Sequence, residues 1–167
     1  MFKPTIFSLL FAFSHLSLAA EETPPTLPQI EIFMPSPCLS CIDWGAYLAD
    51  NGFKVVYTET QNMHKLKKYL NVPSALESTH TARINGYFVE GHAHAEDIYE
   101  LIKEKPKARG IAVPGLPRSA PGRGQSSPTC ETGCTVLDNN NEREVRRELY
   151  ETLLVKPDGS TKIWARH

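Results

Sequence analysis

Two cysteines three residues apart, Cys38 and Cys41, are the residues of this sequence with the most distinctive chemistry. Sulfurs at this spacing bind one metal ion or close into one small disulfide ring. They follow an apolar run, residues 30–33, that predicts a strand, and they open a segment, residues 41–50, that predicts a helix. A helix N-terminus stabilises an anion and so favours the thiolate of Cys38. A permanent structural disulfide is the alternative interpretation, and Met34 is either a soft ligand or a packing residue.

The amino terminus predicts export. Lys3 precedes an apolar run from Ile6 to Leu18, and the small residues Ala19 and Ala20 follow, which is the pattern of a secretory signal peptide at residues 1–19. The run is too short to span a bilayer comfortably, and no later stretch is apolar enough, so we expect no membrane span in the mature chain. Export places all four cysteines in an oxidising compartment, where disulfides persist.

Charge and composition exclude several classes of function. Removing residues 1–19 takes away Lys3 and no acid, which changes the net charge from −1 to −2. A nearly neutral chain gives no electrostatic argument for a nucleic-acid partner or an anionic membrane. No Gly-rich phosphate loop, Ser/His/Asp set or acid pair stands out, which disfavours hydrolysis and nucleotide chemistry.

The remaining patterns predict an α/β domain built around the cysteine pair. After the first strand and helix we expect a strand at 53–59, an amphipathic helix from Met63 to Leu70, a hairpin around Asn85-Gly86 and a helix at 95–104. This order looks like the thioredoxin fold, with a right-handed strand–helix–strand opening.

Three histidine positions are candidates for a site. In the thioredoxin fold the loop entering the third strand faces the cysteine pair, and His80 lies in that loop. The alternative for His80 is a hydrogen-bonded or surface residue. His92 and His94 form an H-x-H pair that can chelate a transition metal, although such pairs also occur at exposed strand ends. His64 lies among lysines on a helix face that we expect to be solvated.

An ordered set of short motifs carries a family resemblance. Its members are Ser36-Pro37 with the cysteines and Trp44, Gly52-Phe53, Val72-Pro73, His80-Thr81-Ala82, Asn85-Gly86-Tyr87, Val89-Glu90-Gly91-His92 and Gly110-Ile111-Ala112-Val113-Pro114-Gly115. Over about residues 30–117 the chain resembles the small CopG-type periplasmic copper-resistance proteins, which have a thioredoxin-like metal-binding domain formerly of unknown function. The resemblance implies a periplasmic protein whose partners are copper and other periplasmic copper-handling proteins. It also implies Cu(I) bound by Cys38, Cys41, His80 and His92.

The chain departs from the family pattern at three positions. The family turn usually reads Cys-x-Cys-Cys, with a further cysteine just before the loop histidine, whereas Ser40 and Thr79 occupy these two positions here. Leu116 replaces a common methionine. These losses argue against a multinuclear cluster and leave open a mononuclear Cu(I) site or a redox dithiol without metal.

Two functional hypotheses therefore stand side by side. The leading one is a copper-binding protein of copper resistance or handling. The other is an enzyme, a thiol–disulfide or copper oxidoreductase with Cys38 as nucleophile and Cys41 as resolving thiol. A degenerate member with only structural disulfides is a third interpretation.

The carboxy-terminal part predicts an extension of the core domain. We expect a tether at 20–29, the core at 30–117 and an extension at 118–167 that begins with a Pro/Gly/Ser-rich linker. A second pair, Cys130 and Cys134, either closes a local disulfide or exchanges with the core pair. A charged helix is expected at 142–151, and a hairpin around residues 157–160.

Overall fold

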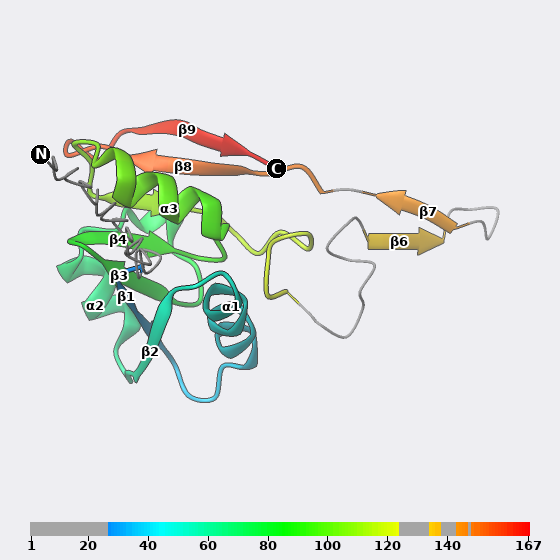
Figure 1. Cartoon of the computed structure of the whole chain (residues 1–167), viewed down its shortest axis with the longest axis horizontal. Helices are drawn as coiled ribbons and strands as arrows, with labels where there is room; N and C mark the ends of the chain where they lie inside the picture. The colour runs from blue at the N-terminus through cyan, green and yellow to red at the C-terminus, as the bar shows by residue number, and fades with distance from the viewer. Residues whose placement is uncertain (1–26, 124–133, 138–142, 147) are drawn as a thin grey trace, which may run out of the picture.

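The computed structural model describes residues 27–123, 134–137, 143–146 and 148–167. A seven-stranded mixed sheet forms its centre, with the order β2-β1-β3-β4-β5-β8-β9 (Figure 1). Its strands are β1 (Gln29–Met34), β2 (Lys54–Glu59), β3 (Thr81–Ile84), β4 (Tyr87–Glu90), β5 (Gly110–Ala112), β8 (Glu151–Val155) and β9 (Thr161–Arg166). The helices are α1 (Leu39–Asp50), α2 (Met63–Tyr69), the short 3-10 helix η1 (Ser74–Leu76) and α3 (Ala95–Glu104).

The first four strands carry the predicted α/β arrangement. β1 and β2 pair in parallel across α1, and β3 pairs antiparallel with both β1 and β4. The Asn85-Gly86 turn joins β3 to β4, with positive φ at both residues, as a two-residue hairpin turn requires. The α/β class is confirmed, and these strand directions agree with the expected thioredoxin-like fold.

Different helices cover the two faces of the sheet. Alternate strand residues such as Ile32, Ala82 and Val89 join Trp44 and Leu48 of α1 and Ile98 and Leu101 of α3 in one core cluster. On the other face, Phe88 and Ala112 pack with Val72 and Leu76, which follow α2. Because side chains alternate along a strand, the face on which one residue lies determines the faces of the other residues of that strand.

The carboxy-terminal hairpin is confirmed, and it belongs to the same sheet. β8 pairs antiparallel with β5, and β9 with β8, around a turn at residues 157–160. Leu154 and Val155 are buried against the core, which explains why the hairpin docks there.

The helix predicted at residues 142–151 is wrong. Arg143–Arg146 is a strand, β7, paired antiparallel with β6 (Cys134–Leu137), and β8 begins at Glu151. The charged segment has too few apolar residues for a helix face, whereas pairing with the β-branched Thr135 and Val136 supplies backbone hydrogen bonds.

Cys130 lies outside the described residues, so the second cysteine pair stays a prediction. Within the described ranges, no helix is long and apolar enough to cross a membrane.

Candidate metal centre

The cysteine pair lies at the start of α1, as the sequence predicts. Cys38 is the N-cap residue and Cys41 lies in the first turn, with a Cα–Cα distance of 5.3 Å and a disulfide between them. Cys38 is 7% exposed and Cys41 is fully buried, and both pack against Met34 at the end of β1. Because a disulfide has no thiolate, metal binding through these sulfurs requires the reduced form.

The strand register brings His80 to the same end of the sheet. Phe33 of β1 pairs with Thr81 of β3, so extending the antiparallel register by one residue sets Met34 opposite His80. Both positions continue the alternation of Ile32 and Ala82, which face α1. His80 therefore lies on the face of the sheet where α1 begins with the cysteines.

The structure brings His80 and His92 together beneath Trp44. Their ring centroids are 4.8 Å apart in an edge-to-face arrangement, and the His80 ring lies 4.6 Å from the Trp44 ring. The Trp44 indole nitrogen donates to the carbonyl of Ala93 at 2.9 Å, which fixes the ring next to the histidines. Both histidines are buried, at 0% and 1% exposure.

Three imidazole nitrogens of this pair have no hydrogen-bond partner in the described part of the chain. They are Nδ1 and Nε2 of His80 and Nε2 of His92. The fourth, His92 Nδ1, lies 2.8 Å from the carbonyl oxygen of Pro121. A carbonyl only accepts, so Nδ1 carries the proton and the lone pair of His92 is on the unpartnered Nε2. This is the arrangement by which proteins orient a histidine ligand.

Burial keeps both imidazoles neutral. It lowers the pKa of His80 to about 3, with further lowering by His92 and by the positive charge of Lys67. Burial also lowers the pKa of His92, with Arg123 acting in the same direction. A neutral imidazole offers a lone pair, so both side chains are in the protonation state that a metal needs.

Two glycines allow the backbone to close around the histidines. Gly91 has a φ of +75°, and a Cβ there would lie 2.6 Å from the carbonyl oxygen of Val113. Gly122 has a φ of +70°, and a Cβ there would lie 2.4 Å from the Cα of Trp44. Gly122 directly follows Pro121, so its close approach to Trp44 lies next to the carbonyl that contacts His92.

A buried ion pair lies under the same strand ends, and the sequence analysis missed it. Lys67 and Glu90 are 3% and 0% exposed, and the Lys67 ammonium donates to the Glu90 carboxylate. Burial raises the pKa of Glu90, whereas Lys67, Thr81 and the amide of Ser78 lower it. The lysines of α2 were expected on a solvated face. Lys67 follows Met63 by four residues and precedes Leu70 by three. This helical spacing places Lys67 on the apolar face of the helix, and it was the sequence pattern that could have predicted its burial.

The other candidate histidines lie apart from this pair. His64 is on the surface, with 78% of its side chain exposed. The His94 ring stacks on His167 with centroids 3.9 Å apart, and its Nε2 lies 2.6 Å from the Tyr150 hydroxyl. The two histidines of the H-x-H pair therefore have different neighbours.

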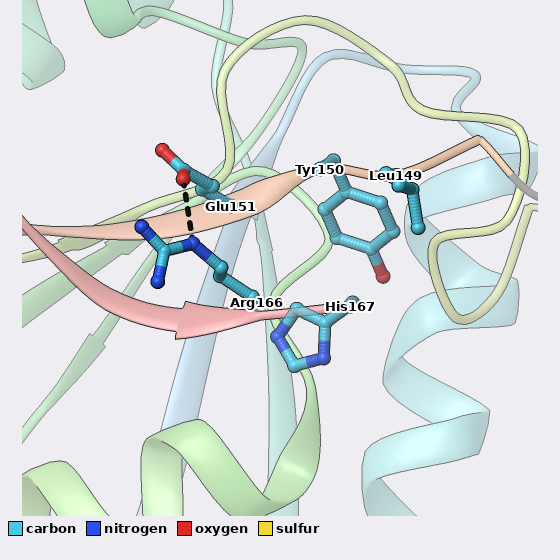
Figure 2. Close-up of a pocket in the computed structure, with 5 residues that line it drawn as sticks. All are labelled: Leu149, Tyr150, Glu151, Arg166 and His167. Atoms are coloured by element: carbon cyan, nitrogen blue, oxygen red, sulfur yellow. Dashed lines mark hydrogen bonds and ion pairs between the residues drawn. The ribbon is translucent and has the colours of Figure 1, made fainter.

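A pocket of about 530 Å³ lies next to this second histidine cluster (Figure 2). Its lining residues are Leu149, Tyr150, Glu151, Arg166 and His167. Arg166 is paired with Glu151 at 3.1 Å, and His167 Nε2 lies 2.9 Å from the buried Asp97 carboxylate. The Arg166 guanidinium and the His167 imidazole thus already have partners, and the rest of the pocket lining is largely apolar.

The residues present at the cysteine end of the sheet fit a soft metal ion. Thiolates and neutral imidazoles suit Cu(I). Two of the three nitrogens without a partner among the described residues, one on each ring, carry the lone pairs that a metal would take, and the third is the N–H group of His80. With the sulfurs joined in a disulfide, no group of three or more His, Cys, Asp or Glu side chains in the described ranges is arranged to hold a metal.

Comparison with known proteins gives matches of two kinds. A family model described as a protein of unknown function, DUF411, matches residues 76–123, a span that contains His80, His92 and Pro121. The chain is also similar to two solved structures titled copper resistance protein CopG, Form 1 and Form 2, each at 31% identity. Each match covers 86% of this chain, together with 98% and 99% of the solved chains, and the TM-scores are 0.69 and 0.70. No curated protein sequence matches the chain.

Proposed function

Because this chain belongs to the CopG family of copper resistance proteins, we propose that it binds Cu(I) through reduced Cys38 and Cys41 together with His80 and His92. The similarity to copper resistance proteins supports a role in copper resistance. The binding residues are the finer part of the proposal, and they rest on the chemistry of this chain.

The observation that carries the proposal is the buried imidazole pair, in which three of the four ring nitrogens have no hydrogen-bond partner among the residues that the structure describes. An unsatisfied buried polar group costs about 1–3 kcal/mol, so it is uncommon without a function. A bound metal would accept the lone pairs of His80 and His92. Their neutral form, which burial enforces, removes the competition from protons at neutral pH.

The cysteines contribute charge and softness to the same site. Reduction of the disulfide consumes two electrons and two protons and gives two thiols. The N-terminal end of α1 stabilises their thiolates, and binding of Cu(I) displaces the thiol protons. Ser40, where the family usually has a cysteine, limits the thiolates in this turn to two.

The test is an anaerobic Cu(I) titration of the reduced protein followed by native mass spectrometry. We expect one copper per chain, and a loss of affinity of at least about tenfold for Cys38→Ser and for His80→Ala. His64→Ala is the matched control, because that imidazole is exposed on α2. Equal and negligible effects of all three substitutions would remove the assignment.

The disulfide itself favours a second candidate function, a thiol–disulfide or copper oxidoreductase. Oxidation of the Cys38–Cys41 dithiol releases two protons and two electrons, enough to reduce two Cu(II) ions to Cu(I) or one disulfide of a partner. Turnover of Cu(II) to Cu(I) by the reduced protein, with loss of two thiols per two copper ions, would support this activity. Binding of copper without electron transfer would exclude the copper oxidoreductase, and failure of the reduced protein to reduce a disulfide substrate would exclude the thiol–disulfide oxidoreductase.

We also propose that the protein acts in the periplasm, delivered there by the signal peptide at residues 1–19. Its partners would be copper and other periplasmic copper-handling proteins. A mature amino terminus at Ala20, determined by mass spectrometry of the exported protein, would test the location.

A further inference from the structure

We infer that Lys67 is a positioning residue of the histidine pair, acting through a closed hydrogen-bonded triad with Glu90 and Thr81. The inference rests on the proposed function for its consequence on copper affinity. It assigns a role to a buried lysine on a helix whose other described lysines, Lys65 and Lys68, are exposed.

The triad joins three elements. The Lys67 ammonium donates to Oε1 of Glu90 and, at 2.8 Å, to the hydroxyl of Thr81. The Thr81 hydroxyl donates to Oε2 of Glu90 at 2.6 Å. The backbone amide of Ser78 donates to Oε1 of Glu90 at 2.5 Å. Helix α2, strands β3 and β4, and the loop before His80 are thus tied to one carboxylate.

The position of the triad relates it to the histidines. Thr81 and Glu90 form the last residue pair of the β3–β4 ladder, and their side chains share the α2 face of the sheet. His80 directly precedes Thr81, and His92 follows Glu90 by two residues. The amide of Gly91 donates to the carbonyl of His80 at 3.3 Å, which continues the pairing one step beyond the ladder. The triad therefore fixes the two backbones at the point where the imidazoles leave them on the opposite face.

Stability alone does not account for this arrangement. Removing two charges from water is costly, and well-packed apolar residues of similar volume are often as stabilising as a buried ion pair or more so. What an ion pair adds is a defined geometry, because its partners must meet at one distance and direction. The Lys67 charge also lowers the pKa of His80, which agrees with its closeness to the site.

The test introduces the double substitution Lys67→Met/Glu90→Gln into two proteins, the wild type and a variant that lacks both histidines. The glutamine keeps an acceptor for the Ser78 amide and a donor for the Thr81 hydroxyl. The packing is therefore conserved while the Lys67–Glu90 ion pair of the triad is lost. We expect Cu(I) affinity, measured by anaerobic competition with a chromophoric chelator, to fall about 10–100-fold, as for other residues that orient metal ligands. In a His80→Ala/His92→Ala background the same change should alter affinity by no more than about twofold. Lys68→Met, which removes an exposed charge from the same helix, should have no effect.

A copper-independent measurement accompanies the titration. In the apo protein, the nuclear Overhauser contact between the His80 and His92 rings should weaken in the double variant and persist in Lys68→Met. Thr81→Val, which removes only the hydroxyl, is the second variant should the double variant fail to fold, and circular dichroism establishes folding in each case.

The outcomes separate this inference from the proposed function. Equal losses of affinity in both backgrounds, or an unchanged ring contact together with unchanged affinity, would overturn the positioning role while leaving copper binding intact. If wild type and the histidine double variant bind Cu(I) equally well, the proposed histidine ligands fail and the inferred effect on copper fails with them. A loss confined to the background with both histidines supports the inference.

Discussion

Replacing His80 with leucine should stabilise the apo protein and weaken copper binding. His80 is fully buried, and neither ring nitrogen has a hydrogen-bond partner among the described residues. Each unsatisfied buried polar group costs about 1–3 kcal/mol. Loss of the contact with Trp44 and imperfect packing of leucine offset part of the gain. We therefore expect His80→Leu to raise the free energy of unfolding of the oxidised apo protein by about 1–3 kcal/mol.

The difference should grow as the pH falls. In the unfolded chain His80 takes up a proton below its ordinary pKa of 6.5, whereas in the folded protein its pKa is about 3. Between these values the unfolded state binds more protons, so wild-type stability falls toward acid pH with a limiting slope of about 1.4 kcal/mol per pH unit. Leucine does not titrate, so His80→Leu should lack this part of the acid sensitivity. His92, whose pKa is also lowered, contributes in the same direction in both proteins.

The assay is urea unfolding of oxidised apo protein at several pH values, followed by Cu(I) titration of the reduced protein. His64→Leu is the control, since that side chain is exposed and should change neither stability nor affinity by much. A lower stability of His80→Leu at neutral pH, together with unchanged Cu(I) affinity, would refute the reasoning. That result would mean that the His80 nitrogens are satisfied by other groups and do not bind metal.

Two further predictions concern the neighbouring residues. In the reduced protein, Cys38 should alkylate faster than Cys41 near neutral pH, because Cys38 caps the helix N-terminus and retains 7% exposure, whereas Cys41 has none. Peptide mapping over time would measure both rates, and equal rates would contradict the assignment. Gly122→Ala should destabilise the protein by about 1–3 kcal/mol, because φ is positive at this position and the new Cβ would meet the Trp44 backbone. Gly86 also has a positive φ, but a Cβ there would meet open space, so Gly86→Ala should destabilise the protein less. Thermal unfolding would measure both changes in stability.

Local patterns were sufficient to predict the elements around the cysteine pair. The apolar run before Cys38, the Asn85-Gly86 turn and the amphipathic segment at 95–104 each carry their own signal, and the structure has β1, β3–β4 and α3 there. His80 required the fold as an intermediate, since only the β1–β3 register brings it to the end of the sheet where α1 begins.

What the sequence did not predict depends on partners distant along the chain. Lys67 is buried because Glu90, 23 residues later, neutralises it, and no local pattern of α2 contains that information. Arg143–Arg146 is a strand because β6 pairs with it. The Pro121 carbonyl that sets the tautomer of His92 is a backbone group, so residue identity gives no signal for it.

The docking of β8 on β5 changes which strand forms the border of the sheet on the side opposite β2. β5 is short, apolar and wholly buried, and its backbone groups would be free for another chain to pair with if nothing lay beside it. The border strand is instead β9, where the exposed charged residues Lys162 and Arg166 discourage such pairing. The carboxy-terminal hairpin thus covers the edge of β5, and a chain cut back to residues 30–117 should self-associate more readily although it keeps all four proposed ligands.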